Sequence, residues 1–398
     1  MDKERRYIRK RIRKSRLQSI PFYLCRIFPI RKKKITFCCI EGTTGYTCNP
    51  KYIAQELIRR DEGYELVWLV NDTSKRFPRE IKAVRNTLWN RAYHLTTAHF
   101  WIDNSRKQLE ARKRRGQIYI QTWHAKLGFK PTCLDRGASF SRMAYLVSKH
   151  DSDMIDYVLS NSRWYDDTLP TGMIYSGPVL RTGSPRCDIL VNDRTRPRQE
   201  TREAYGLPQD ARLIMYAPTF RGGSQETDRT IEANRGYPDF ERMAQALERR
   251  FGGTWHILLR LHPQLVARNM DEPYGRDKRV IDVSRADDMY EILAGCDAFM
   301  TDYSSAAFDA AVMRIPVFLY ADDYAEYEKE RGKLLWDLRK LPFPLAADDD
   351  ELEQRVADFD EPRYRQGLER LFADTETVED GRAAEHVADK LRELMRDE

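Results

Sequence analysis

Residues 297–309 read D-A-F-M-T-D-Y-S-S-A-A-F-D, and this segment combines the two elements that recur along the chain. The apolar run Ala298 to Met300 predicts a buried strand, and Ser304 or Ser305 can cap a helix that follows directly. A strand that leads into a helix N-terminus makes an anion site, because unpaired backbone N–H groups point at the turn. The hydroxyl groups of Thr301 and the two serines would add donors for phosphate. The alternative interpretation is an ordinary strand–turn–helix with a capping serine.

The same alternation of short apolar runs and amphipathic stretches continues on both sides of this segment. A second series of strands is predicted at Leu213 to Tyr216, Trp255 to Leu261, Val280 to Val283, Ala298 to Thr301 and Val317 to Leu319. A first series is predicted at Ile35 to Ile40, Glu65 to Val70, His99 to Ile102, Gln117 to Gln121, Tyr157 to Leu159 and Met173 to Tyr175. Continuous apolar runs suit parallel strands that are covered on both faces. The sequence therefore predicts an α/β protein with two doubly wound, Rossmann-like domains, whose ligands bind at the carboxyl ends of the strands.

The predicted organisation has four parts. They are a basic arm at residues 1–35, a first Rossmann-like domain at 36–195, a second at 196–375, and an amphipathic C-terminal helix at 376–398. The last helix is indicated by apolar residues at steps of three or four, from Ala384 to Leu394.

The charge of the chain is unevenly distributed. The 398 residues include 68 Lys+Arg against 62 Asp+Glu, a formal net charge of +6. Residues 1–35 carry fourteen basic side chains and two acidic ones, so the arm is +12 and the rest of the chain is −6. The arm interleaves its cations with apolar residues such as Tyr7 and Ile12, which favours an anchor on an anionic membrane surface. The alternatives are a solvated disordered tail and a non-enzymatic polyanion-binding protein, although the acidic body argues against nucleic acid as the partner.

Several classes of protein lack their sequence signatures here. The best apolar stretch, Leu17 to Ile30, is short and broken by prolines, and no secretory signal is present, so we expect an intracellular protein without a spanning helix. The seven cysteines are odd in number and never spaced as CxxC, which predicts reduced, mostly buried thiols. The motifs HExxH, GxSxG, the P-loop and the glycine-rich dinucleotide fingerprint are absent. We therefore predict no metal and no certain cofactor.

A histidine follows the fourth strand of the first series. His124 ends the string Q-T-W-H, and an imidazole that titrates near neutrality is the usual general base. Asp103 and Asn104 end the preceding strand and are placed to orient neighbouring groups. The alternative for His124 is a histidine that is hydrogen-bonded within a turn.

Polar residues also end two strands of the second series. The string R-L-H-P places Arg260 and His262 after one strand, and Ser284 ends the next. A cation beside a phosphate supplies the positioning and charge neutralisation that phosphoryl transfer needs. A structural or merely exposed histidine is the alternative for His262, and Asp288 is expected to cap a short helix.

Eight strings in the same order make the chain similar to the CDP-glycerol glycerophosphotransferase family, whose members prime and polymerise teichoic acids and related polymers. The strings are N-P-K-Y at 49–52, Q-T-W-H at 121–124, G-S-P-R-C-D at 183–188, Y-A-P-T-F-R at 216–221, R-L-H-P at 260–263, D-V-S at 282–284, T-D-Y-S-S at 301–305, and the segment 320–332. Each string alone carries little information, but the ordered set is specific.

The resemblance implies a GT-B-type architecture, with two Rossmann-like domains facing a cleft and the donor CDP-glycerol held mainly by the second. It implies that a hydroxyl of a lipid-linked saccharide or polyol-phosphate acceptor attacks the β-phosphorus and that CMP leaves. It assigns catalysis to His124, as the base, and to His262. Donor binding is assigned to Arg260, Ser284, Thr301, Asp302, Ser304 and Ser305, and supporting roles are assigned to Asp103, Asn104, Arg221 and Asp309.

Two positions depart from the family pattern. Ala125 stands where the family usually has glycine, and Cys187 stands where it usually has asparagine, and both changes bear on acceptor geometry. The choice between CDP-glycerol, CDP-ribitol and another activated polyol stays open, as does the choice between primase and polymerase. With this resemblance the arm is interpreted as a peripheral tether at the cytoplasmic face of the cell membrane, for cell wall or capsule biogenesis.

Overall fold

The computed structural model describes residues 2–219, 221–222, 231–232, 236–261, 278–331 and 333–396. The chain forms two compact units, each built around its own parallel sheet. Unit 1 comprises Met1–Lys126, Thr132–Asp188 and Val378–Glu398, and unit 2 comprises Leu127–Pro131 and Ile189–Thr377. The predicted α/β class with two Rossmann-like, doubly wound domains is confirmed by these two sheets.

The sheet of unit 1 has seven strands in the order β3-β2-β1-β4-β5-β6-β7. They are β1 (Arg31–Cys38), β2 (Glu65–Val70), β3 (Ile81–Arg85), β4 (Ala98–Asp103), β5 (Ile118–Gln121), β6 (Tyr157–Ser160) and β7 (Val179–Arg181). The strand order reverses between β1 and β4, where Cys38 pairs with Asp103 at the carboxyl ends of both strands. Such a reversal is a topological switch point, the place where doubly wound sheets bind ligands.

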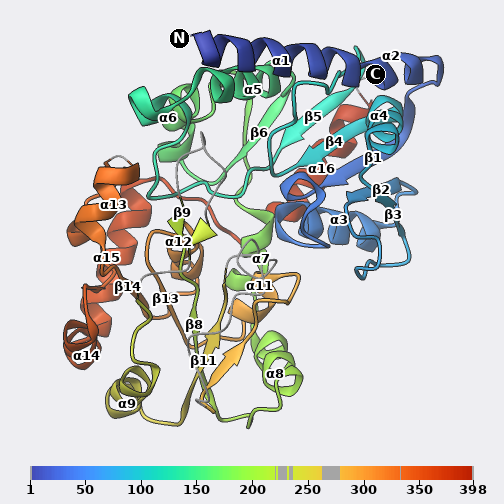
Figure 1. Cartoon of the computed structure of the whole chain (residues 1–398). Coiled ribbons are helices and arrows are strands. Elements are labelled where there is room, and N and C mark those ends of the chain that lie inside the picture. The colour runs from blue at the N-terminus through green and yellow to red at the C-terminus, as the bar shows by residue number, and fades with distance from the viewer. Residues whose placement is uncertain are drawn as a thin grey trace. The chain divides into compact units, whose positions relative to one another are not determined.

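Helices cover both faces of this sheet, as Figure 1 shows. On one face, Phe37 and Trp68 pack in a core with α3 (Cys48–Arg60) and with α16 (Ala383–Arg396) from the end of the chain. On the other face, Trp101 packs with α2 (Ile20–Leu24), α4 (Leu88–Thr97) and α6 (Arg163–Gly172). Because both faces are buried, central strands such as β2 and the second half of β1 are rich in buried apolar residues, whereas β1 begins with exposed cations.

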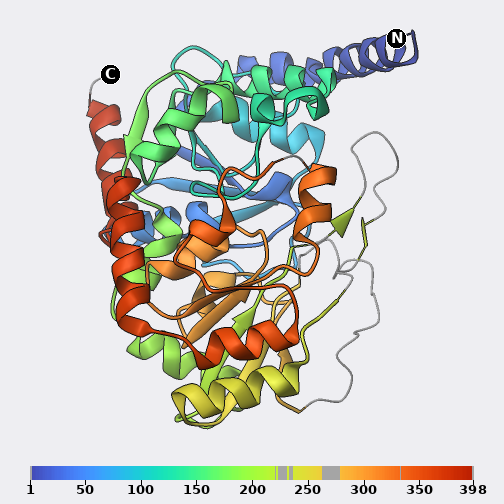
Figure 2. The ribbon, with the colours of Figure 1, turned by 90° about the vertical axis from the view of Figure 1, so that its left-hand side faces the viewer.

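The basic arm is helical in its described part. It forms α1 (Asp2–Gln18), α2 and the short 3-10 helix η1 (Cys25–Ile27), and β1 begins at Arg31. Phe22 is fully buried in the core, whereas the N-terminal turns of α1 extend past the neighbouring helices of unit 1 (Figure 2). The arm is therefore partly docked, which differs from the disordered tail of the alternative interpretation.

The sheet of unit 2 has six parallel strands in the order β12-β11-β8-β13-β14-β15, with a switch point between β8 and β13. They are β8 (Arg212–Tyr216), β11 (Trp255–Leu259), β12 (Val280–Asp282), β13 (Ala298–Thr301), β14 (Val317–Tyr320) and β15 (Leu345–Ala346), and a separate antiparallel pair is β9 (Arg221–Gly222) with β10 (Ile231–Glu232). Its helices include α8 (Thr195–Ala204), α9 (Phe240–Phe251), α11 (Met289–Leu293), α12 (Ala306–Ala311), α13 (Tyr324–Arg331), α14 (Asp349–Ala357) and α15 (Glu361–Asp374).

The predicted strand at Met173 to Tyr175 is wrong. Met173 caps α6, Ile174 has a φ of 58°, and the strand of this region is β7, Val179–Arg181. Met173 and Tyr175 are apolar because they fill the core beside α6, and not because they pair in the sheet. The short edge strands β3 and β15 were not predicted, since an edge strand needs fewer apolar residues than a central one.

Two predictions about composition can be compared with the fold. All seven cysteines are buried and none is bridged to another, which confirms the prediction that they are core residues. Among the described residues, no helix has both the length and the apolar character needed to cross a membrane.

Candidate active site

The turns that follow β1 and β4 are joined at the switch point of unit 1. The backbone N–H of Ile40 donates to Oδ1 of Asn104 (2.8 Å), and that of Glu41 donates to Oγ of Ser105 (3.0 Å). Ile40 and Glu41 have φ values of 43° and 56°, which side-chain-bearing residues adopt at a cost in free energy. Strained backbone at a switch point is typical of a functional site.

Asp103 organises the turn that carries Asn104. It is buried and accepts hydrogen bonds from the backbone N–H (2.8 Å) and the hydroxyl (2.9 Å) of Ser105, and it forms an ion pair with the buried Lys107. Asn104 is also fully buried. Both residues therefore orient neighbouring groups in the structure, while their supporting role in function stays a prediction.

His124 lies beside this turn, near the start of the loop that leaves β5. Its Nδ1 is 2.8 Å from the carbonyl oxygen of Asn104. Because a carbonyl only accepts, Nδ1 must carry the proton, and the lone pair of Nε2 is left available. The residue before it, Trp123, has a φ of 49°, so the left-handed conformation falls on Trp123 and not on Ala125. The backbone at Ala125 therefore does not require the glycine that the family usually has there.

The surroundings of His124 favour the neutral imidazole. Burial lowers the pKa of His124 to about 4; the cations Arg186 and Arg106 act in the same direction, and the hydrogen bond to Asn104 opposes them. Neutral imidazole with a free Nε2 is the form that can accept a proton at neutral pH.

Two further residues hold this loop, and the sequence did not assign a role to either. Asn49, at the start of α3, donates from Nδ2 to the carbonyl oxygens of Thr122 (3.2 Å) and Trp123 (2.7 Å) and accepts from the backbone N–H of Arg186 (3.1 Å). Arg186 in turn donates to the carbonyl oxygen of His124 (2.5 Å). Both lie in strings of the family resemblance, which was the available signal. Cys187 is fully buried in unit 1.

The switch point of unit 2 is built in a similar way. Asp302 accepts hydrogen bonds from the backbone N–H (2.9 and 3.1 Å) and the hydroxyl (2.9 Å) of Thr219, which follows β8. Thr301 donates to the carbonyl oxygen of Ala217 (2.6 Å). Thr301 and Asp302 are fully buried, so they hold the two turns together, and their assignment as donor contacts stays a prediction.

The two serines of the same segment lie closer to the surface. Ser304 and Ser305 are half-buried; the hydroxyl of Ser304 accepts from the backbone N–H of Ala306 (3.3 Å), and Ser305 occupies the N-cap position of α12 without a capping side-chain hydrogen bond. Asp309 of α12 accepts from the hydroxyl of Tyr290 (2.6 Å) and links α12 to α11. Of this segment, the serine hydroxyls are the groups best placed for a phosphate.

Arg260 and Ser284 meet at the ends of β11 and β12. Nη1 of Arg260 donates to the carbonyl oxygens of Val283 (2.7 Å), Ser284 (3.1 Å) and Ala286 (2.6 Å), and the backbone N–H of Leu261 donates to Oγ of Ser284 (2.8 Å). Burial lowers the pKa of the Arg260 guanidinium from its ordinary value. Asp288 caps α11 as predicted, by accepting from the backbone N–H of Tyr290 (3.0 Å).

The structure thus brings the predicted residues together in one group at the switch point of unit 1 and in two groups at carboxyl ends of strands in unit 2. His124, Asp103 and Asn104 form the group in unit 1, and Arg260 with Ser284 and the segment Thr301–Ser305 belong to unit 2. The predicted catalytic His262 and the side chain of Arg221 lie outside the described residues.

Residues 21–393 match the model of a protein family described as CDP-glycerol:poly(glycerophosphate) glycerophosphotransferase. The chain therefore belongs to this family, and the resemblance of the ordered strings is confirmed.

Individual relatives agree with this family. A teichoic acid poly(glycerol phosphate) polymerase of Staphylococcus epidermidis is 26% identical over 387 residues, which are 93% of this chain and 52% of that protein. A teichoic acid glycerol-phosphate transferase of Staphylococcus aureus is 27% identical over 358 residues, 87% of this chain and 90% of that one. The chain spans about half the length of the first of these relatives, and ribitol-phosphate polymerases are also similar to it.

The fold has a solved counterpart. The structure of the wall teichoic acid polymerase TagF superimposes with a TM-score of 0.81 at 25% identity, over 99% of this chain and 97% of that chain. This likeness confirms the predicted GT-B-type class of two Rossmann-like domains.

Proposed function

We propose that this chain transfers glycerol phosphate from CDP-glycerol to a hydroxyl group of a lipid-linked saccharide or polyol-phosphate acceptor and releases CMP, in the synthesis of teichoic acid or a related cell-surface polymer. One observation carries the proposal: a neutral histidine with a free Nε2 lies at the switch point of unit 1 in a chain that belongs to a glycerophosphotransferase family.

In the proposed reaction, His124 is the general base. Its Nε2 takes the proton of the acceptor hydroxyl as the acceptor oxygen forms a bond to the β-phosphorus of the donor. The bond between that phosphorus and the oxygen that bridges to the α-phosphate breaks, and its electron pair leaves with CMP. Asn104 keeps the ring in place through Nδ1 (2.8 Å), so only Nε2 faces the acceptor.

The donor is assigned to unit 2. Arg260 carries positive charge at the end of β11, and the serines Ser304 and Ser305 present hydroxyl groups at the start of α12. Charge neutralisation and positioning of the diphosphate are what phosphoryl transfer mainly requires. In this assignment Ser284, Thr301 and Asp302 hold the turns from which these groups project, and His262 acts as the second catalytic histidine.

The direct test is incubation of the protein with CDP-glycerol and a lipid-linked acceptor. We expect CMP in the nucleotide fraction and, by mass spectrometry, an acceptor extended by glycerol phosphate. The absence of CMP with every polyol-phosphate acceptor, including primed ones, would refute the proposed function.

A second donor is favoured by a specific observation. Relatives of similar identity include a poly(ribitol-phosphate) polymerase, and the groups assigned to the diphosphate would serve either donor. In a competition assay with equal concentrations of CDP-glycerol and CDP-ribitol, the polyol incorporated into the product identifies the preferred donor.

The arm is proposed as a peripheral membrane anchor on the cytoplasmic side. Six of its large apolar residues between 17 and 28 are exposed, with Leu17 at 68% and Ile27 at 82% exposure. They are Leu17, Ile20, Tyr23, Leu24, Ile27 and Phe28, here called the apolar patch. Exposed apolar side chains beside a polybasic helix fit the interface of an anionic bilayer.

Serine substitutions at Leu17, Leu24 and Ile27 together are expected to weaken binding to anionic vesicles by about 100-fold, at about 1 kcal/mol for each apolar side chain withdrawn from the interface. Vesicle co-sedimentation measures this change. Substitution is a sharper test than deletion of the first 30 residues, because deletion would also remove the buried Phe22.

The matched control replaces three exposed apolar residues elsewhere, Leu134, Leu335 and Val378, by serine. This control should bind vesicles as the unmodified protein does. An equal loss in both triple variants would show that the apolar patch is not the anchor.

A further inference from the structure

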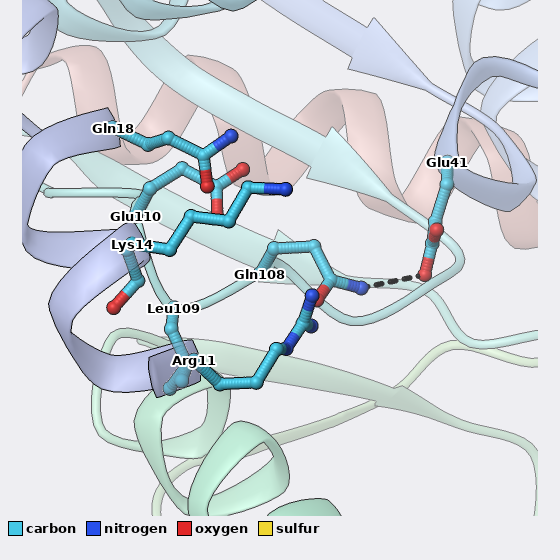
Figure 3. A pocket seen from close by; sticks show the side chains of 8 residues that line it. Arg11, Lys14, Gln18, Glu41, Gln108, Leu109 and Glu110 are labelled. Carbon is cyan, nitrogen blue, oxygen red and sulfur yellow. Dashed lines mark hydrogen bonds between the residues drawn. The ribbon is translucent and has the colours of Figure 1, made fainter. Parts of the chain in front are cut away.

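A pocket of about 320 Å³ lies between helix α1 and the loops that follow β1 and β4 in unit 1. Its lining residues are Arg11, Lys14, Ser15, Gln18, Glu41, Gln108, Leu109 and Glu110, and we call it the α1 pocket. Figure 3 shows the side chains of Arg11 and Lys14 reaching from α1 toward Gln108. The four residues of α1 follow one another at steps of three, one and three, so they form a single stripe of the helix.

Packing alone does not account for this stripe. A helix that docks for stability turns an apolar face toward the body of the protein. Helix α1 does bury the apolar Ile8, but its following turns line the pocket with two cations and an amide, and Tyr7 and Leu17 are exposed. The polar stripe therefore requires another explanation.

The charges of the pocket are only partly compensated. Glu110 forms an ion pair with Arg91 (2.7 Å), and Gln108 donates to Glu41 (2.9 Å). Within the described ranges, neither Arg11 nor Lys14 makes a hydrogen bond or an ion pair. Glu110 is thus already neutralised by Arg91, and the lining cations Arg11 and Lys14 have no such partner among the described residues. An anion between them would gain charge-assisted hydrogen bonds.

The remaining polar groups suit hydroxyls. Glu41 has acceptor capacity beyond its bond to Gln108, and Gln18 offers both a donor and an acceptor. A bare phosphate would be repelled by the carboxylate of Glu41. A polyol that carries a phosphate can place its hydroxyl groups there instead. The set of groups therefore fits the phosphate ester of a small polyol.

The pocket is linked to the candidate base by two hydrogen bonds. The backbone N–H of Glu41 donates to Oγ of Ser105 (3.0 Å), and the preceding residue, Asn104, holds Nδ1 of His124 (2.8 Å). One lining residue of the pocket, Glu41, is therefore hydrogen-bonded to the turn that also holds the imidazole of His124.

We propose that the α1 pocket binds a glycerol-phosphate group and that Arg11 and Lys14 contact its phosphate. The role of this group as part of the acceptor rests on the proposed function, but the binding itself does not. The same chemistry has two sources: the unit of the acceptor that precedes the reactive hydroxyl, and the headgroup of an anionic glycerophospholipid.

The test uses the full chain and two matched double variants. Arg11→Gln/Lys14→Gln removes the cations of the pocket, and Arg13→Gln/Arg16→Gln removes two exposed cations of the same helix that do not line it. Calorimetry with sn-glycerol 3-phosphate, without membranes, is expected to show binding weakened at least about tenfold in the first variant only. Equal weakening in both variants, or none in either, overturns the proposal.

Two additional experiments identify the source of the glycerol-phosphate group and distinguish failure of this proposal from failure of the proposed function. If the acceptor supplies the group, the pocket variant raises KM for a soluble glycerol-phosphate oligomer and leaves KM for CDP-glycerol unchanged. If a lipid supplies it, the unmodified protein prefers phosphatidylglycerol vesicles over phosphatidylserine vesicles of equal charge, and the pocket variant alone loses that preference. Binding of sn-glycerol 3-phosphate that depends on Arg11 and Lys14, in a protein that releases no CMP, would refute the proposed function and leave the site standing.

Discussion

Replacement of His124 by alanine is expected to lower kcat/KM for CMP release by about 10²- to 10⁴-fold, the usual contribution of a positioned general base. The loss follows from the geometry of the ring: Nδ1 is engaged by the carbonyl of Asn104 at 2.8 Å, so Nε2 is the nitrogen that can take the acceptor proton. The measurement is initial-rate CMP release under subsaturating acceptor.

The matched control is His386→Ala. His386 lies on α16, is partly exposed and 3.6 Å from Asp380, and is not among the residues assigned to the site. Both variants should keep the circular dichroism of the parent. Full activity in the His124 variant, or an equal loss of activity in both variants, would show that His124 is not the general base.

A pH profile gives this prediction a second readout. Burial lowers the pKa of His124 to about 4, so the imidazole stays neutral and able to accept a proton as the pH falls through the usual histidine range near 6.5. The acid limb of kcat/KM that belongs to His124 should therefore lie near pH 4. An acid limb of kcat/KM near the ordinary pKa of histidine would show that a different group is the general base.

Replacement of Asp103 by alanine is expected to lower the free energy of unfolding by about 3–5 kcal/mol, because it leaves Lys107 as an uncompensated buried charge. The side chains of Lys107 and Asp103 are only 7% and 2% exposed. Burial alone would lower the pKa of Lys107, but the neighbouring Asp103 outweighs it and the pKa is raised. Chemical denaturation followed by circular dichroism measures the change.

The chain offers a matched pair for comparison. Lys149 and Asp153 have the same spacing of four residues, but their side chains are 44% and 58% exposed, so Asp153→Ala should cost less than about 1 kcal/mol. The double variant Asp103→Ala/Lys107→Met should recover much of the lost stability, since it removes the stranded charge. Equal effects at Asp103 and Asp153 would contradict the assignment of a buried ion pair.

Most of the fold was predictable because runs of apolar residues indicate which segments are buried. The central strands of both sheets are covered on two faces, so segments such as Ala298–Thr301 are apolar throughout and were predicted. The same rule misled at Met173 to Tyr175, where core side chains beside a helix are as apolar as a strand. It missed the edge strand β3, whose Lys82 is exposed.

The candidate site was predictable only in part. His124, Asp103 and Asn104 each follow a strand, and the carboxyl ends of parallel strands gather at one edge of a sheet. Asn49 and Arg186 come from distant parts of the chain, and their backbone hydrogen bonds to the His124 loop have no sequence period that could reveal them. Thr301 and Asp302 were predicted as ligand contacts, whereas their described hydrogen bonds join two turns of the protein.

The sequence by itself determined the α/β class, the basic arm, the buried cysteines and the family, because these properties depend on composition, local periodicity and short ordered strings. Only the tertiary structure decided which tautomer His124 adopts, which residues hold its loop, and that α1 lines a pocket with Arg11 and Lys14. These features depend on contacts between segments far apart in the chain, and such contacts form only when hydrophobic burial has brought the strands and helices together.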